Sequence, residues 1–306
     1  MIKSAATFIF VFIYAFASSQ ITQKDSSYDC LAHWKKGEEK VLLINRKKEK
    51  SESSKPEPPF TFSYEAYVTV LDSTKEGYML QWVFHLPDEV KKETPGLAEA
   101  MPVYEGLKMI FVTDKMGAFK ELINWQEVKD AYIKMMEFSL PQNLDDTAKA
   151  AIKKTEELFN SKEMVESALI KEIQLYYSPY GAAFTIKGSS HQGSLQNPFV
   201  DEPIPATLSE KITELAPQLD YVKITVDQQI DMGKAGNLFE GLFRKMNLPE
   251  DSVLIKAKDL LSNLEIKEHK DYLITQSTGW IRTLTYQSTS KIAETNTIDS
   301  FVIEIK

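Results

Sequence analysis

The sequence is short of the residues that most often carry chemistry, with one cysteine and four histidines among 306 residues. The single cysteine, Cys30, excludes a disulfide within the chain, so the fold must rely on its hydrophobic core. Sequence motifs of zinc peptidases, phosphate-binding loops, dinucleotide-binding loops, calcium loops and serine-nucleophile elbows are all absent. No Asn-x-Ser/Thr sequon occurs either, which argues against a glycosylated eukaryotic secreted protein and favours a bacterial one.

The chain also lacks a basic surface of the kind that binds nucleic acid. Its formal net charge is −8, and no stripe of lysine and arginine compensates for the excess of carboxylates. The most basic segment, residues 35–55, is interleaved with glutamates and is predicted to be a solvated strand and loop. A nucleic-acid partner is therefore excluded.

The first residues have the three parts of a secretory signal peptide. Lys3 precedes an apolar run over residues 5–16, and Ala17, Ser18 and Ser19 follow as small residues. The run is too short to cross a bilayer, so cleavage before Gln20 is preferred to an uncleaved anchor. No later stretch is long and apolar enough for a transmembrane helix. We expect residues 1–19 to be removed and the mature chain to be exported, periplasmic or secreted.

The strongest structural signal is an alternation of apolar and polar residues over 60–70 that restarts over 78–86. A period of two indicates strands with one buried face, and the short link closed by Gly77 predicts an antiparallel hairpin. A weaker strand is expected at 41–44, followed by a loop over 51–59. Near the C-terminus, Ile266, Tyr272 and Ile274 share one strand face, but Glu268 and Lys270 interrupt it.

The order of strands and helices predicts an α+β fold. Two largely antiparallel β-meander regions, residues 40–123 and 182–306, bracket a helical middle with three helices between 125 and 177. We expect residues 20–306 to form a single α+β unit, and the pattern suggests two pseudo-repeated halves, 20–180 and 181–306.

Other segments have weaker patterns. Residues 20–34 are expected to be a mobile lead-in or a short helix, and residues 188–205 a long loop. One or two helical turns are predicted over 208–215, a strand over 220–230 and a short helix over 233–246.

None of the histidines occurs in a recognisable catalytic or metal-binding pattern. Cys30 and His33 form a lone C-x-x-H, whereas structural zinc needs four ligands, so Cys30 is interpreted as a small buried hydrophobe. His85 and His269 lie on the wetter strand faces, and Asp271 could form a dyad with His269. His191 shares the expected loop with Ser189 and Ser190. We assign no catalytic residue, metal ligand or cofactor, and the ligand-binding residues are unknown.

Aromatic side chains dominate the apolar strand faces. They are predicted to form the core, and the alternative is that some line a cavity: Tyr64, Tyr78, Trp82, Phe84, Trp280 and Tyr286.

Three short stretches carry a resemblance to a known family. They are Asp114-x-x-Gly117 leading to Asn124-Trp125, the proline-rich residues 197–206, and Ser277-Thr278-Gly279-Trp280 before the final strands. Together they resemble an exported, envelope-associated family of unknown function from Gram-negative bacteria, which implies no activity or site residue. The strand-rich halves are also similar in shape to the half-barrels of bacterial lipoprotein carriers.

These observations favour a non-catalytic exported protein that binds an apolar ligand or an envelope partner. Long strands with aromatic faces packed on amphipathic helices can enclose an apolar cavity. The alternatives are a secreted hydrolase with an unrecognised site and a purely structural envelope protein.

Overall fold

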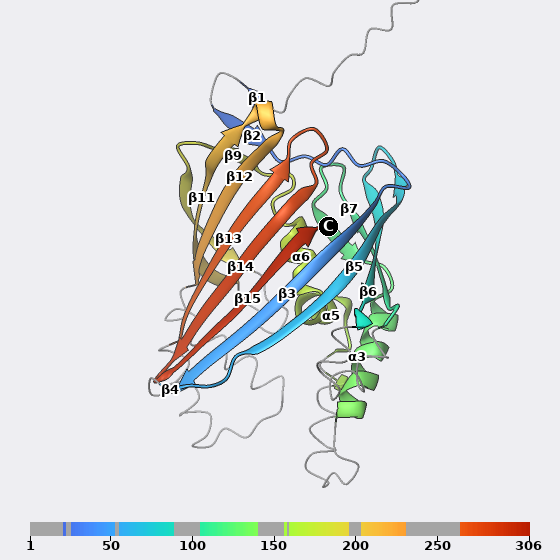
Figure 1. The fold of residues 1–306 in the computed structure, drawn as a ribbon, viewed down its shortest axis with the longest axis vertical. Coiled ribbons are helices and arrows are strands. Elements are labelled where there is room, and N and C mark those ends of the chain that lie inside the picture. Colours follow the sequence, from blue (N-terminus) through green and yellow to red (C-terminus); the bar gives the residue numbers. More distant parts are fainter. Residues whose placement is uncertain are drawn as a thin grey trace, which may run out of the picture.

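The computed structural model describes residues 21–22, 26–52, 55–88, 105–139, 156–157, 159–195, 203–230 and 264–306. These residues form one 12-stranded sheet, a small three-stranded sheet and three helices longer than one turn (Figure 1). The large sheet has the order β10-β11-β12-β13-β14-β15-β3-β5-β6-β7-β8, with β4 beside β3, and every neighbouring pair is antiparallel.

The strands of the first half are β1 (Ile21–Thr22), β2 (Ser27–Asp29), β3 (Glu39–Glu52), β4 (Lys55–Pro56), β5 (Phe60–Ser73), β6 (Tyr78–His85), β7 (Lys108–Thr113) and β8 (Phe119–Leu122). The helices α3 (Trp125–Ser139), α5 (Lys162–Leu169) and α6 (Lys171–Tyr177) follow. The second half has β9 (Ala183–Thr185), β10 (Ser189–Leu195), β11 (Ile204–Ala216), the 3-10 turn η2 (Pro217–Leu219), β12 (Tyr221–Ile230), β13 (Glu265–Thr275), β14 (Ile281–Ile292) and β15 (Thr295–Ile305).

The predicted α+β fold class is wrong, because the two strand regions are one sheet. The last strand, β15, pairs along its length with β3, from Thr295 opposite Glu52 to Ile305 opposite Leu42. Both strands alternate apolar residues toward the same face, so pairing them joins two apolar surfaces that separate sheets would leave exposed. The helices therefore do not form a layer between two sheets. They lie against one face of a single, strongly twisted sheet (Figure 1).

The central hairpin has the predicted antiparallel pairing. Val68 lies opposite Trp82 and Ala66 opposite Phe84, with a bulge between Val70 and Asp72. Trp82 is 1% exposed and contacts the ring of Tyr176 on α6. We call the sheet face that carries Trp82 and meets α6 the inner face, and the opposite one the outer face.

The register arranges inner-face residues of six strands in rows. The upper row is wholly apolar or aromatic: Ile224, Tyr272, Leu284, Ile303, Ile44 and Tyr64. One step toward the lower end in Figure 1 lies what we call the mixed row: Val226, Lys270, Tyr286, Phe301, Arg46 and Phe62. The next, the polar row, has Gln228, Glu268, Ser288, Asp299, Lys48 and Phe60. The inner face therefore changes from apolar to charged along the strands.

Residues 26–34, part of the segment predicted to be a mobile lead-in or a short helix, contribute to the core. Tyr28, Cys30 and Trp34 are each at most 2% exposed, and the ring of Trp34 lies 4.8 Å from that of Trp280. The segment runs against the turn before β14, where Gly279 has a φ of +74°. A Cβ on Gly279 would lie 2.1 Å from the carbonyl oxygen of Leu31, so only glycine permits this approach.

Two further predictions in the second half are wrong. Residues 189–195 of the expected loop form β10, and the expected helical turns at 208–215 belong to β11. Both segments are polar or irregular in pattern, and pairing makes them strands: β11 pairs with the edge of β12, and β10 pairs with the edge of β11. The strand at 220–230 is confirmed as β12, and the helix predicted over 233–246 lies outside the described residues.

The predicted helix from Trp125 to Ser139 is confirmed as α3. The second expected helix, over residues 145–159, lies mostly outside the described residues. The third is divided at Ile170 into α5 and α6, and its N-terminal cap is Ser161, whose hydroxyl accepts a hydrogen bond from the Met164 amide. The division allows α6 to present Tyr176 and Tyr177 to the core while Lys171 and Glu172 reach the mixed row.

Candidate functional site

Four consecutive charged residues of β13 alternate between the two faces of the sheet. Glu268 and Lys270 lie on the inner face, and His269 and Asp271 lie on the outer face. In the sequence, Glu268 and Lys270 are noticeable because they interrupt an otherwise apolar strand face. Two clusters of polar groups result, one on each side of the same strands.

The inner cluster consists of Lys171, Glu268, Lys270 and Tyr286. Lys171 Nζ donates a hydrogen bond to Tyr286 Oη at 2.7 Å, and Tyr286 Oη donates to Glu268 Oε1 at 2.6 Å. Lys270 Nζ lies 3.2 Å from Glu268 Oε2, and Lys171 Nζ lies 4.0 Å from Glu268 Oε1. Two ammonium groups therefore share one carboxylate within the described part of the chain.

Most of this cluster is removed from water. The side chains of Lys270 and Glu268 are 9% and 14% exposed, whereas that of Lys171 is 42% exposed. Burial by itself raises the pKa of the Glu268 carboxyl, but the attraction of Lys270 and the Tyr286 hydrogen bond outweigh it, and the pKa is lowered. Burial, followed by the charge of Glu268, raises the pKa of the Tyr286 hydroxyl. Glu268 is therefore ionised and Tyr286 is protonated at neutral pH.

The other end of the mixed row has a different charge balance. Arg46 Nη1 lies 2.8 Å from Glu172 Oε1, and Arg46 Nη2 lies 3.5 Å from Asp299 Oδ1. One guanidinium thus faces two carboxylates. Lys48 also lies opposite Asp299 at this end, so an anion added to the inner face would be attracted more strongly to the Lys171 and Lys270 end than to the Arg46 end.

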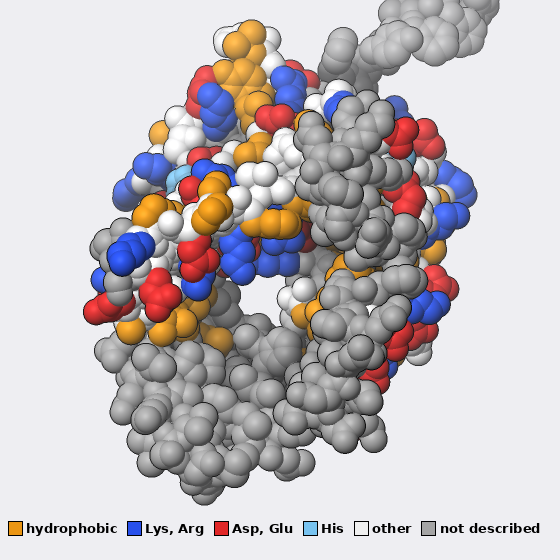
Figure 2. Space-filling model, turned by 60° about the horizontal axis from the view of Figure 1, so that its bottom comes forward, with side chains coloured by type: hydrophobic (Ala, Val, Ile, Leu, Met, Phe, Trp, Pro, Cys, Tyr) orange, Lys and Arg blue, Asp and Glu red, His pale blue; other side chains and the backbone are white. Residues whose placement is uncertain are grey.

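Apolar side chains border the inner cluster. On β11, β12 and β13, Ala206 is buried, and Leu208, Ile230 and Ile266 are half-buried on the inner face. We call these four residues the lower apolar patch. On the other side of the cluster, Tyr286 stacks on Phe301 with ring centroids 4.8 Å apart. Figure 2, which brings the lower end forward, shows a hollow whose described side is bordered by Lys or Arg and hydrophobic side chains.

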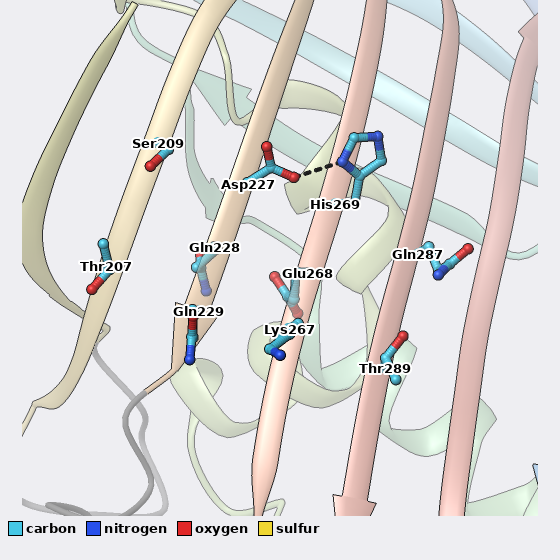
Figure 3. Close-up of a pocket in the computed structure, with 10 residues that line it drawn as sticks. All are labelled: Thr207, Ser209, Asp227, Gln228, Gln229, Lys267, Glu268, His269, Gln287 and Thr289. Atoms are coloured by element: carbon cyan, nitrogen blue, oxygen red, sulfur yellow. Dashed lines mark hydrogen bonds and ion pairs between the residues drawn. The ribbon is translucent and has the colours of Figure 1, made fainter.

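The outer cluster surrounds His269 (Figure 3). His269 Nδ1 lies 2.7 Å from Asp227 Oδ1, and its Nε2 lies 2.9 Å from Asp271 Oδ2. His269 and Asp227 line an open, polar hollow of about 380 Å³ on β11 to β14, whose other side chains include Thr207, Ser209, Gln287 and Thr289. The hydrogen bond to Asp227 raises the pKa of His269, burial opposes it, and Asp271 adds to the rise.

This outer geometry does not make a nucleophile–base pair. Both ring nitrogens of His269 are engaged by carboxylates, and the hydroxyl of Thr225 donates a hydrogen bond to Asp271 at 2.6 Å rather than to the ring. The two carboxylates lie at opposite edges of the ring, so they cannot join His269 around one metal ion. Among the described residues, no group of three or more His, Cys, Asp or Glu side chains is arranged to hold a metal ion.

The other residues considered from the sequence do not converge. Cys30 is buried as interpreted, whereas His33 beside it is exposed. His191 and Ser190 are neighbours on β10 and point to opposite faces, and Ser190 Oγ accepts a hydrogen bond from Ser209 at 2.9 Å. His85 lies on the wetter face as expected, with Nδ1 2.5 Å from Glu105 Oε1. The predicted core aromatics are buried, except Tyr78, which is half-buried.

Sequence patterns could not identify Lys171 and Tyr286 as members of the inner cluster. Lys171 occurs at a helix start and Tyr286 in an alternating strand, and 115 positions separate them. Only the register of β13, β14 and β15 and the placement of α6 bring the two together.

No family model matches the chain, and no curated protein matches it, so the resemblance to an envelope-associated family stays a prediction. A solved structure titled for lipid–protein interactions in lipovitellin is similar over 90% of this chain, with 10% identity and a TM-score of 0.38. The chain spans 25% of the lipovitellin chain. Ail, the attachment invasion locus protein of Yersinia pestis, is similar over 88% of this chain and 98% of its own, with 3% identity and a TM-score of 0.18. Both TM-scores are below 0.5, so neither likeness carries an argument about function.

Proposed function

We propose that this chain is an exported, non-catalytic protein that binds an amphipathic ligand against the inner face of its sheet. The ligand's polar group lies at the inner cluster, and its apolar part lies on the lower apolar patch. The observation that carries the proposal is the cluster of Lys270, Glu268 and Tyr286, which is largely removed from water and lies directly below the apolar and aromatic upper row of the same sheet face.

Burying such charges is costly. Each ion loses several kcal/mol of hydration, on the order of 3 or more, and well-packed apolar residues usually give an equal or more stable core. The upper row demonstrates that this sheet can fill its inner face with apolar side chains. Charged residues in a buried setting are more common at functional sites than in plain cores. The cluster is therefore better explained by binding than by stability.

The position of the cluster supports an amphipathic rather than a wholly apolar ligand. The upper inner face is occupied by Trp34, Tyr176 and Tyr177, each at most 2% exposed, so it offers no room beside these residues. The half-buried side chains of Leu208, Ile230 and Ile266 lie beside the charges instead. Export is supported by the signal-like residues 1–19. No helix among the described residues is long and apolar enough to span a membrane.

Native mass spectrometry of the protein purified from its own cells tests the proposal. We expect a noncovalent adduct of lipid-like mass that organic extraction removes. Ile266→Ser should reduce its occupancy severalfold, whereas Lys267→Ser, the next residue on the outer face, should not. A chain that carries no adduct, or that carries a stoichiometric protein instead, would contradict the amphiphile and favour a structural or partner-binding role.

The hydrolase alternative is tested separately at His269. Broad esterase, glycosidase and peptidase screens should give no turnover that His269→Ala abolishes. A positive result would show that the outer cluster rearranges to free one ring nitrogen for catalysis.

A further inference from the structure

The inner cluster has more positive than negative charge. Lys171 and Lys270 both lie within 4.0 Å of Glu268, whose carboxylate is their shared ion-pair partner. Tyr286, the fourth member, is neutral because burial raises the pKa of its hydroxyl. The four side chains therefore carry one unit of surplus positive charge on the inner face.

Among the described residues, Lys270 has fewer ion-pair and hydrogen-bond partners for its burial than Lys171 has. An ammonium group has three hydrogen-bond donors, and the side chain is only 9% exposed, so water reaches it poorly. Its described ion-pair partner is one oxygen, Glu268 Oε2, at 3.2 Å. A buried donor without an acceptor costs about 1–3 kcal/mol, and more when it is charged. Additional anionic oxygens beside Lys270 would remove that cost.

Lys171 is the more solvent-accessible of the two lysines of the inner cluster. Its side chain is 42% exposed, and its Nζ lies 4.6 Å from the centroid of the Tyr286 ring, which directs the ammonium over β14. A ligand that arrives from the lower end can therefore contact Lys171 before it reaches Lys270. Glu172, the next residue, forms an ion pair with Arg46 instead. The start of α6 therefore contacts both the Lys270 part and the Arg46 part of the mixed row.

We infer that the bound amphiphile is anionic and that Lys171 and Lys270 hold its carboxylate or phosphate, while the lower apolar patch holds its hydrocarbon chain. The inference rests on the proposed function and specifies its ligand class. Charge complementarity selects this occupant, since a neutral head group would leave the surplus charge of the four described side chains without a counter-ion. The Arg46 end, with two carboxylates, sets the direction in which the ligand lies.

Isothermal titration calorimetry with three probes tests the inference: decyl phosphate, decanol and inorganic phosphate, with delipidated protein and all probes below their aggregation limits. We expect decyl phosphate to bind at least about tenfold more tightly than decanol, since a charge-assisted hydrogen bond contributes roughly that factor. Lys270→Met and Lys171→Met should each remove most of this preference, and Lys171→Arg should retain it. The matched control is Lys267→Met on the outer face of the same strand, which should bind like the wild type.

The outcomes separate the inference from the proposed function. Equal binding of decanol and decyl phosphate would overturn the anionic head group and leave the amphiphile in place. Binding of inorganic phosphate as tight as that of decyl phosphate would retain the anion site and overturn the role of the hydrocarbon chain. If neither the wild type nor Lys171→Arg binds any of the three probes, both the inference and the proposed function are overturned. If Lys270→Met does not fold, the half-exposed Lys171 supplies the same test.

Discussion

Glu268 and Lys270 point to one face of β13, and His269 and Asp271 point to the other, so consecutive charged residues occupy two unlike environments. The inner pair is at most 14% exposed, and the outer pair is 45% and 52% exposed. In water the outer charges are screened and contribute little to stability. In the interior the same kinds of charge interact strongly and pay a large hydration cost.

The difference indicates which cluster has been kept for a reason other than stability. An exposed Asp-His-Asp arrangement costs little to maintain, so its presence by itself carries little information. A buried carboxylate shared by two lysines is expensive, and the apolar row above it shows that the fold does not need it. The inner cluster is therefore the stronger candidate for a binding site.

Trp82→Ala sets the scale for a buried apolar side chain of the inner face. Trp82 is 1% exposed, and removing a buried tryptophan side chain costs about 3–5 kcal/mol of unfolding free energy. Urea unfolding followed by circular dichroism measures the change. Gln81→Ala, the neighbouring outer-face residue, should lose under about 1 kcal/mol. Equal midpoints for the Trp82 variant and the wild type would place Trp82 outside the core.

Glu268→Ala breaks the inner cluster, and we expect a loss of about 3 kcal/mol because it leaves Lys270 buried without its counter-ion. Asp271→Ala on the outer face should cost below about 1 kcal/mol in the same urea titration, as is usual for an exposed pair. The double variant Glu268→Leu, Lys270→Met should recover most of the loss, since it removes both charges together. Equal losses for Glu268→Ala and Asp271→Ala would abolish the distinction between the two faces.

We expect the outer cluster to make a small, pH-dependent contribution to the free energy of unfolding. The pKa of His269 is raised in the folded state, so its contribution is complete below the unfolded-state pKa of about 6.5. It is lost as the pH rises through the higher folded-state pKa. Because the group is exposed, we expect only a few tenths of a kcal/mol, roughly 0.3, between pH 6 and pH 9. Thermal melts of His269→Gln should lack this slope. A slope of the same size in that variant would assign the effect to other groups.

The sequence predicted the alternating strands well and the polar ones poorly. The hairpin of β5 and β6 was evident because both strands alternate cleanly, and α3 because its apolar residues recur at helical spacing. By contrast, β10 and the charged end of β3 have no such alternation, and they become strands through pairing with β11, β5 and β15. Tyr28 and Trp34 entered the core for a similar reason, since contacts with distant Phe184 and Trp280 place them.

The candidate site was predictable in one part only. Glu268 and Lys270 were noticeable because they interrupt an apolar face, but nothing local indicates that Lys171 and Tyr286 complete the cluster. The predicted α+β class failed over an even longer distance in sequence, because the pairing of β15 with β3 joins residues more than 240 positions apart. Such long-range pairings depend on the register of every intervening strand, which a single sequence does not specify.

Photo-crosslinking with decyl phosphate that carries a terminal diazirine tests the central claim most directly, because it records which face of the sheet holds the ligand. After irradiation and proteolysis, mass spectrometry should locate the label on inner-face residues of the lower apolar patch, Leu208, Ile230 or Ile266, and Lys270→Met should reduce it. Label on Ser209, Gln229 or Lys267, the outer-face neighbours in the same strands, with no dependence on Lys270, would contradict the account.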